Sequence, residues 1–423
     1  MSGQGSAPRP LIIVDNSLID ERGHHLALAN TLSRAALAEG RPVVIYAHEA
    51  LDPALLPNGV DLRPVFTLSV YELFARKLLQ HDMGDEMREV LAQIARDHPD
   101  GGRILFHTAD AYTFCAMSDW LGQDAPGQGR WDIHMVTPYE PKLMPGFALK
   151  MGHLHRALFA LARFRHPGIK LYFWTETARL AEFYRRAYTL KSSVLELPAP
   201  QWATDPQFAP AQQRDKLVLL FLGAAREEKG FLHLPGLAEE ISRRKGLADK
   251  VVLRLQRSAP ISGMPPKIGE AFDSLAKLPF VEIIEGAMEL ADYASEMRAC
   301  DMTLLLYSPV NYFARGSGIV METLCSGKYA LAMRGTFMER LEHEGMAKFG
   351  ATPAEWADHI ETLAGDRDAA RARAAEAGAK FADQFSPGRY LAQLQTRERY
   401  DQHFDTVHAL GMRHALPILA APS

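Results

Sequence analysis

The chain has 423 residues, with 47 Lys and Arg against 51 Asp and Glu, and hence a formal net charge of −4. Hydrophobic residues make up 47% and charged residues 23%, which is typical of a soluble globular protein. The length predicts about two or three domains. The charge argues against a dedicated nucleic-acid binder, which would usually be strongly basic.

Cysteine usage and hydropathy indicate the compartment. The three cysteines are too few and too scattered for a disulfide framework or a zinc cluster, so a reducing cytoplasm is the simplest location. The apolar run near the N-terminus stops at Asp15. No run elsewhere has the about 18 residues of a membrane span. We therefore expect a cytoplasmic protein without a signal peptide or a membrane span.

The first half of the chain alternates buried-strand patterns with amphipathic helical patterns. Strands are expected at 11–14, 43–47, 103–107, 133–136 and 171–175. Helices are expected near 26–37, 84–97, 110–122, 150–165 and 177–187. This alternation indicates βαβ units, and therefore a parallel sheet with right-handed crossovers.

A proline-rich stretch at 196–216 interrupts the pattern and is expected to be a linker. The alternation then resumes. Strands are expected at 217–222, 251–256, 281–285, 302–307 and 329–333, and helices near 231–244, 266–277, 290–299, 318–326, 353–364 and 366–384. The predicted fold class is α/β, with two Rossmann-like, doubly wound domains that face a central cleft. We assign them to 1–200 and 201–395, and leave 396–423 as a C-terminal segment.

The segment from Phe221 to Gly230 (FLGAAREEKG) joins an expected strand to an expected helix. Gly223 permits a tight turn. Arg226 and Lys229 add two cations where the N-terminus of a helix also favours an anion. The pattern predicts a clamp for a diphosphate. The alternative is a solvated turn with two surface cations.

A second strand-to-helix segment contains the run ARGSG followed by IVME. Gly316, Ser317 and Gly318 can bring backbone amides close to a phosphate, and Arg315 adds positive charge. Glu322 lies one turn inside the expected helix, where a carboxylate can accept hydrogen bonds from two ribose hydroxyls. The alternative for Glu322 is an exposed or capping residue.

Together the two segments resemble the donor half of family-4-like retaining glycosyltransferases with the GT-B architecture. Those enzymes carry Gly-Arg-Leu-x-x-Glu-Lys-Gly in the first segment, then Glu-x-Phe-Gly and a helix with Glu-Ala-x-x-x-Gly. The matching residues here are Gly223, Glu228, Lys229, Gly230, Glu322 and Gly327. The loop ERGHH at 21–25, before a helix that ends at Glu39 and Gly40, resembles the family's glycine loop. The resemblance also implies that 396–423 packs back on the first domain.

Two positions depart from the family pattern. Ala224 stands where the family has arginine, so Arg226 would have to reach the diphosphate instead. Ala314 stands where the family has the first glutamate of a carboxylate pair, a residue that contacts the transferred sugar. The run from Arg315 to Gly318 indicates a variant branch whose donor loop uses an arginine and backbone amides.

The first domain offers histidines at the ends of expected strands. Gly23, His24 and His25 would face the cleft, where the glycine admits the donor phosphates and one histidine contacts a sugar. A helix-capping polar loop is the alternative. His107 ends a strand and would face the same cleft, whereas His134 lies inside a strand and is expected to be packed in the core.

The resemblance implies a metal-independent, retaining glycosyltransferase. The donor would be a nucleotide-sugar such as a UDP- or GDP-sugar. The acceptor would be a glycan, a lipid-linked or another hydroxyl compound, in bacterial-type polysaccharide or glycoconjugate synthesis. We find no Asp-x-Asp motif at a strand end, and expect no metal or cofactor. The catalytic candidates are His24, His25, His107 and Glu322. The donor-binding candidates are Gly23, Gly223, Arg226, Lys229, Arg315, Gly316, Ser317, Gly318, Ile319 and Glu322.

Other functions stay open. Ala314 and Ala224 favour a degenerate GT-B module that binds a nucleotide or glycan without transfer. A nucleotide-sugar epimerase or a phosphorylase would keep the fold, although no feature marks a lysine for pyridoxal phosphate. A basic amphipathic helix within 150–170 would attach the protein peripherally to an anionic surface at the inner face of the cell membrane. An ordinary domain helix is the alternative there.

Overall fold

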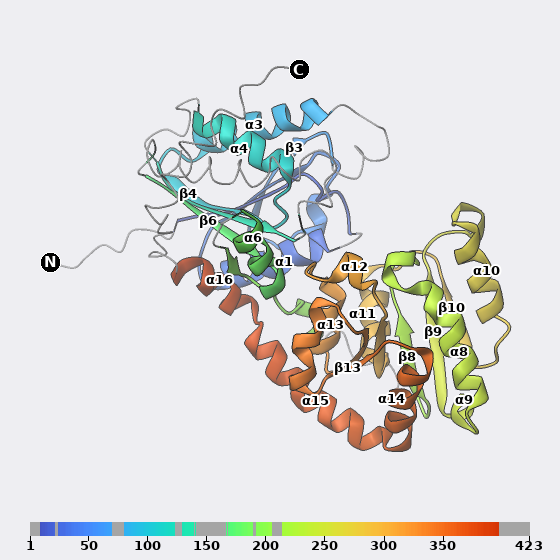
Figure 1. Cartoon of the computed structure of the whole chain (residues 1–423). Helices are drawn as coiled ribbons and strands as arrows, with labels where there is room; N and C mark the ends of the chain where they lie inside the picture. Colours follow the sequence, from blue (N-terminus) through green and yellow to red (C-terminus); the bar gives the residue numbers. More distant parts are fainter. Residues whose placement is uncertain are drawn as a thin grey trace.

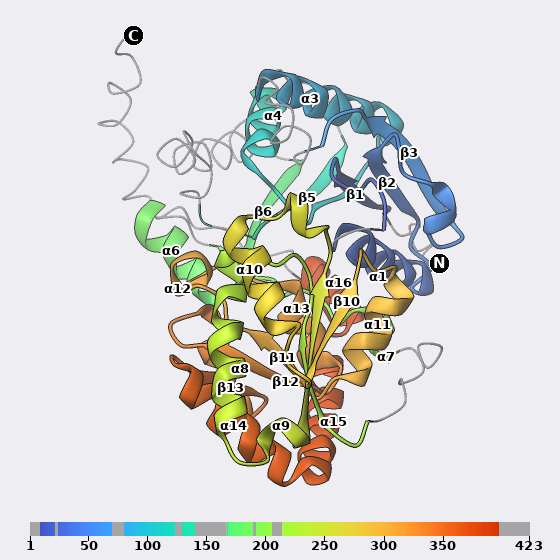
Figure 2. The ribbon, with the colours of Figure 1, turned by 90° about the vertical axis from the view of Figure 1, so that its right-hand side faces the viewer.

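The computed structural model describes residues 9–21, 24–69, 80–122, 129–138, 140, 166, 168–188, 192–204 and 214–396. Figure 1 shows two α/β bodies, each built around one parallel sheet. In the turned view of Figure 2 the first domain lies above the second, with α1 (His25–Ala38) and α16 (Pro387–Thr396) at their junction. The predicted fold class is therefore confirmed.

The first domain has, within the described residues, a seven-stranded parallel sheet in the order β3-β2-β1-β4-β5-β6-β7. Its strands are β1 (Leu11–Asp15), β2 (Val43–His48), β3 (Val60–Phe66), β4 (Gly101–Phe106), β5 (Arg130–Thr137), β6 (Ile169–Thr175) and β7 (Ser193–Val194). Besides α1, the helices are η1 (Pro53–Leu55), α3 (Gln80–Asp97), α4 (Ala111–Gly122) and α6 (Ala178–Tyr188). The strand order reverses between β1 and β4, so a ligand crevice is expected at their carboxyl ends.

The second domain has a six-stranded parallel sheet in the described part of the chain, in the order β10-β9-β8-β11-β12-β13. Its strands are β8 (Leu217–Phe221), β9 (Val251–Arg257), β10 (Val281–Glu285), β11 (Met302–Leu305), β12 (Tyr329–Met333) and β13 (Ala347–Gly350). The helices are α7 (Gln201–Thr204), η3 (Glu227–Lys229), η4 (Phe231–His233), α8 (Leu234–Arg243), α9 (Leu247–Lys250), η5 (Ile261–Gly263), α10 (Pro266–Leu275), α11 (Leu290–Ala299), α12 (Pro309–Tyr312), α13 (Gly318–Cys325), η6 (Phe337–Glu344), α14 (Pro353–Gly365) and α15 (Arg367–Gln384).

Both faces of each sheet are covered, which explains the continuous apolar runs of the central strands. In β1, Ile12 and Val14 join the apolar cluster on one face, whereas Leu11 and Ile13 join the cluster on the other. His134 of β5 is fully buried and accepts a hydrogen bond from Trp174 Nε1 at 3.0 Å. Its assignment to the core is confirmed.

The sequence prediction missed several short or exposed elements. The edge strand β3 is largely exposed and contains Pro64, so it shows no apolar run. The strands β7 and β13 and the helix α12 are too short for a periodic signal. The expected linker at 196–216 contains α7. The basic helix expected near 150–165 lies outside the described residues, and Lys170 belongs to β6.

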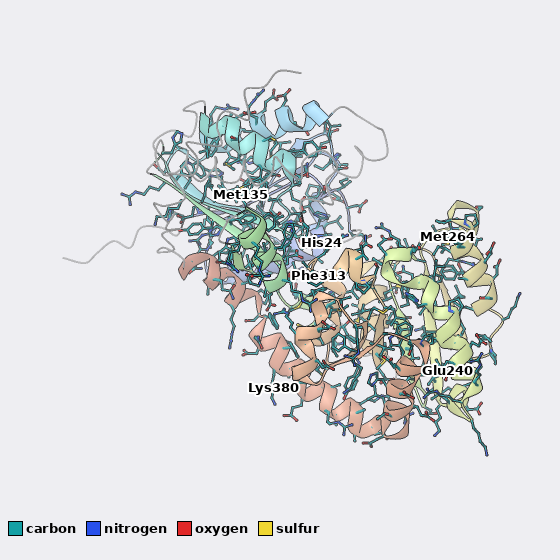
Figure 3. The ribbon with its side chains drawn as sticks, viewed as in Figure 1. His24, Met135, Glu240, Met264, Phe313 and Lys380 are labelled. Carbon is teal, nitrogen blue, oxygen red and sulfur yellow. The ribbon has the colours of Figure 1, made fainter. Side chains whose placement is uncertain are left out.

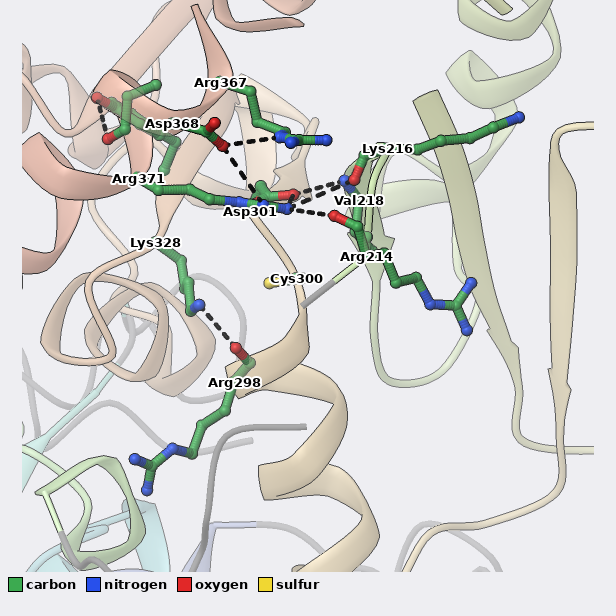
Figure 4. Close-up of polar contacts among 12 residues, drawn as sticks. Arg214, Lys216, Val218, Arg298, Cys300, Asp301, Lys328, Arg367, Asp368 and Arg371 are labelled. Atoms are coloured by element: carbon green, nitrogen blue, oxygen red, sulfur yellow. Dashed lines mark hydrogen bonds and ion pairs between the residues drawn. The ribbon is translucent and has the colours of Figure 1, made fainter. Parts of the chain in front are cut away.

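The helix α15 is anchored to the second sheet by a buried acidic residue. Asp301, which precedes β11, accepts hydrogen bonds from Arg371 Nε at 2.6 Å and from the backbone N–H of Val218 at 2.7 Å (Figure 4). Removing either partner would leave a buried charge unpaired, which is costly. This contact joins α15 to the second sheet.

The chain crosses between the domains twice. It first passes into the second domain after Leu195, and α16 then returns, so that Tyr390, Leu391 and Leu394 pack in the apolar cluster with α1. The backbone N–H of Ala199 donates to the carbonyl of Phe385 at 2.7 Å, which joins the two crossings. The predicted domain limits stay predictions, and 397–423 lies outside the described residues. No helix of the described chain combines the length and apolarity needed to cross a membrane.

Candidate functional site

The two domains meet where the segment that follows β6 contacts the loop before α13. The hydroxyl of Thr177 donates to the carbonyl of Ala314, and the Arg179 guanidinium donates to the carbonyls of Phe313 at 3.3 Å and Gly335 at 3.1 Å. Figure 3 labels His24 and Phe313, both at the junction of the domains. The carboxyl ends of the first sheet therefore face the donor loop suggested by the sequence.

Three buried polar residues cluster at the ends of β1 and β4. Oδ2 of Asp15 lies 2.7 Å from His25 Nδ1 and 2.8 Å from His107 Nε2. The other carboxylate oxygen of Asp15 accepts a hydrogen bond from the backbone N–H of Ser17 at 2.9 Å. The arrangement follows from the topology, because neighbouring parallel strands bring their carboxyl ends to one edge of the sheet.

The cluster stabilises charge. Burial would raise the pKa of Asp15, but the charges and hydrogen bonds of His25 and His107 hold this pKa well below its ordinary value. Burial opposes the charged form of His25, whereas Asp15 outweighs it and raises the His25 pKa. The cluster therefore favours a carboxylate beside an imidazolium, which can orient a histidine for proton transfer. Its three ligand atoms lie within 4.8 Å of one another, and metal ions accept such donors too.

The predicted glycine loop is described in part. Gly23 lies outside the described residues. His24 precedes α1 with an exposed side chain, and its ring centroid lies 4.4 Å from that of His25. Desolvation by the surrounding protein lowers the pKa of His24, and the charges of His25, His107 and Arg315 lower it further. We expect a neutral imidazole that faces the second domain.

In the second domain, the segment after β8 places a lysine against a glycine. Gly223 has a φ of 87°, and a Cβ at this position would lie 3.1 Å from Lys229 Nζ. The backbone N–H of Gly223 donates to Gln256 Oε1 at 2.8 Å. Desolvation lowers the pKa of Lys229, and the positive charges of Arg226 and Arg315 lower it further. Three cations thus share one region with the carboxylates of Glu228 and Glu322, and the surplus of positive charge favours an anion.

The two arginines of this region differ in their surroundings. The Arg226 side chain is 60% exposed, and one of its nitrogens lies 3.6 Å from a carboxylate oxygen of Glu228. The Arg315 guanidinium lies 5.3 Å from the ring centroid of Tyr312. Arg226 is thus free to move on its stem, whereas the aromatic ring helps to hold Arg315.

The predicted phosphate site falls at the start of α13. Ser317 caps the helix with an extended backbone and no side-chain capping bond, and Gly318 begins it. Glu322 is half-buried and accepts a hydrogen bond from the hydroxyl of Tyr293. Burial raises the pKa of Glu322. Ile319 is partly buried against the core of the second domain.

Sequence reasoning missed Asp15 and Glu176. Glu176 follows β6 directly, is 8% exposed and lies against Gly316 of the other domain. Burial raises its pKa to about 7, although the charge of Arg315 lowers it. A carboxylate at the end of a strand was the available signal for both residues. Ala314, the departure from the family pattern, is fully buried and packs in the first domain's apolar cluster.

No protein-family model matches the sequence, and no curated protein is similar to it. Among solved structures, the chain is similar to the α,α-trehalose-phosphate synthase (UDP-forming) from Burkholderia xenovorans in complex with glucose-6-phosphate, with 10% identity, a TM-score of 0.63 and coverage of 91% of this chain and 100% of that one. For HepE of Anabaena in complex with UDP and glucose, the identity is 14%, the TM-score 0.58 and the coverage 92% and 99%. For sucrose-phosphate synthase from Thermosynechococcus elongatus the values are 11%, 0.60, 92% and 98%. At such identities the likeness shows the fold, which is GT-B.

Proposed function

We propose that the protein is a glycosyltransferase that moves a sugar from a nucleotide-sugar to a hydroxyl acceptor. The observation that carries the proposal is the grouping of Lys229, Arg226 and Arg315 beside the N-terminus of α13, with Glu322 one turn inside that helix. A diphosphate would bind the cations and the helix amides, and Glu322 would bind the ribose. The complexes of similar fold with UDP or a sugar phosphate support this assignment.

In the proposed reaction the chain stabilises the leaving diphosphate by charge. Lys229 and the amides at Ser317 and Gly318 would neutralise the negative charge that develops when the bond to the sugar breaks. Retention follows from front-face attack by the acceptor hydroxyl, whose proton passes to the leaving phosphate. His24 would line the acceptor side, with the buried His25 and His107 behind it. We propose that no metal takes part.

The experiment is a thermal-shift panel of UDP, GDP, ADP and CMP. A ligand at 100 times its Kd should stabilise the protein by about 2.7 kcal/mol, which such an assay resolves. One diphosphate should raise the Tm of the wild type, and Lys229→Ala should lose the shift. If none of these nucleotides raises the Tm, the proposal is wrong.

A second candidate is a module that binds a nucleotide or glycan without transfer. Ala314 favours it, because no carboxylate stands on the donor loop at that position. Slow hydrolysis of a nucleotide-sugar that disappears in Glu322→Ala would favour transfer. Tight nucleotide binding without turnover across a broad panel of donors and acceptors would favour the module.

The acceptor and the location are parts of the same proposal. A glycan or a lipid-linked hydroxyl compound would enter from the first domain. Attachment to an anionic membrane would use 150–170, most of which lies outside the described residues. Sedimentation with vesicles that contain anionic lipid, compared with vesicles of neutral lipid, tests the attachment.

A further inference from the structure

Glu176 reaches from the first domain into the donor loop of the second. It follows the last residue of β6, at the edge of the sheet where ligands are expected. A Cβ at position 316 would overlap the Oε2 atom of Glu176 and lie 3.1 Å from its Cβ atom. The glycine at 316 therefore makes room for this carboxyl group, so the two domains are fitted to each other here.

Glu176 is buried, and no hydrogen bond joins its carboxyl group to another described residue. The residue is only 8% exposed, and the positive charge of Arg315 acts on its carboxyl group. Buried polar groups nearly always have a partner, because leaving one unpaired costs free energy. A carboxyl group so placed beside the donor loop is available to a ligand.

Glu176 also lies close to Ala314, because its neighbour Thr177 donates a hydrogen bond to the Ala314 carbonyl. The donor loop has no carboxylate at 314, where the side chain is fully buried in the first domain's apolar cluster and the carbonyl is bonded to Thr177. Glu176 presents a carboxyl group two residues along the same loop, at Gly316. Gly316 directly precedes the predicted phosphate site at the start of α13.

We propose that Glu176 binds the transferred sugar by accepting hydrogen bonds from its hydroxyl groups, and that it thereby selects the sugar. A carboxylate has two oxygens that can each accept bonds, which suits a pair of neighbouring hydroxyls. The proposal rests on the proposed function and names the group that recognises the sugar of the donor. Sugar recognition would then require both domains, since the diphosphate is bound by the second and the sugar by the first.

The test compares the affinity for a nucleoside diphosphate with the affinity for its sugar ester. Titration calorimetry with UDP and UDP-glucose, or with GDP and GDP-mannose if the thermal-shift panel selects guanine, gives the ratio of the two Kd values. Glu176→Gln should raise the Kd of the nucleotide-sugar about tenfold and leave the Kd of the diphosphate unchanged. The ratio of the two Kd values then changes by the same factor. Glu182→Gln is the matched control, because Glu182 lies on α6 and is ion-paired at the surface with Arg185 and Arg186.

The outcomes separate the two proposals. Failure of the wild type to bind any nucleoside diphosphate would overturn the proposed function. Normal binding of the diphosphate with an unchanged ratio in Glu176→Gln would overturn the role of Glu176 alone. An equal loss for both ligands would mean a structural role and would also overturn it. If Glu176→Gln does not fold, Glu176→Asp is measured in its place, and its displaced carboxylate should weaken only the nucleotide-sugar.

Discussion

The two sides of the cleft carry different kinds of charge. On the first domain, Asp15 and His107 form a buried cluster whose charges already compensate one another. On the second domain, desolvation and the like charges of Arg226 and Arg315 lower the pKa of Lys229, and Arg226 is largely exposed. The cluster of the first domain is thus compensated without a ligand. On the second domain, a bound anion would relieve the repulsion among the cations. This predicts that the second domain supplies most of the free energy of nucleotide binding.

The largest expected effect comes from disrupting the buried cluster of the first domain. Asp15→Ala removes the acceptor that His25 and His107 share, so we expect the free energy of unfolding to fall by about 3–5 kcal/mol. Urea denaturation measures this change. Asp61→Ala, which removes an exposed partner of Arg63, should cost less than about 1 kcal/mol. Equal losses in the two variants would contradict the distinction between the buried cluster and the surface.

The next largest effect comes from removing a cation of the second domain. Lys229→Ala should reduce turnover of the nucleotide-sugar about 100- to 1000-fold, because a cation near the leaving diphosphate stabilises the transition state. The control is Lys380→Ala on α15, which removes a lysine from an exposed pair with Glu376. Steady-state kinetics with both variants should show the loss in the first alone. Full activity of Lys229→Ala would show that the diphosphate binds elsewhere.

The third prediction concerns pH. Burial raises the pKa of Glu176 from 4.5 to about 7, so the folded protein retains a proton that the unfolded chain releases in this range. Stability therefore falls as the pH rises from 4.5 to 7, and the cost of up to about 3 kcal/mol is complete above that range. Glu176→Gln should be more stable than the wild type by this amount at about pH 8, and no more stable near pH 4.5. Denaturation at both pH values tests the sign.

A smaller effect is expected behind the ribose site. Tyr293→Phe removes the hydroxyl that donates to Glu322, so the affinity for a nucleoside diphosphate should fall about three- to tenfold. Tyr329→Phe, whose hydroxyl donates to the carbonyl of Ala370 in the same domain, is the control. Calorimetry with UDP and 2′-deoxy-UDP should show that Tyr293→Phe reduces the preference for the 2′-hydroxyl. An unchanged preference for the 2′-hydroxyl in Tyr293→Phe would show that Glu322 does not bind the ribose.

The last prediction is that removal of metal ions has no effect on the rate of transfer. If arginine, lysine and helix amides suffice for the diphosphate, an excess of EDTA should leave the initial rate of transfer unchanged. A loss that zinc restores would instead assign a metal to Asp15, His25 and His107. The two outcomes distinguish a cluster that orients a histidine from a cluster that binds a metal.

The donor side could be predicted because its signals are local in sequence. Gly223 and Lys229 lie in one strand-to-helix connection, and Gly318 and Glu322 lie one turn apart on a helix, so spacing alone groups them. The first side could not be predicted in the same way. Asp15 meets His107 only because β1 pairs with β4, and the strand order of a sheet cannot be deduced from periodicity.

Glu176 shows a second limit of the sequence. Its role depends on a contact with Gly316 of the other domain, and no pattern within either segment encodes how two domains face each other. The alternation of strands and helices did predict both sheets, because buried parallel strands are continuously apolar. It failed at the exposed edge, where β3 has few buried residues.

The hydrogen bond between Ala199 and Phe385 has a mechanical consequence. Since it joins the two places where the chain passes between the domains, the covalent links behave as one pivot and not as two separate tethers. We expect relative motion of the domains to be a swing about this point. A swing would break the bonds of Arg179 to Phe313 and Gly335 while leaving the pivot intact. Substrate entry by such a swing would therefore require these polar contacts to be exchanged for water and Ala314 to leave the apolar cluster of the first domain.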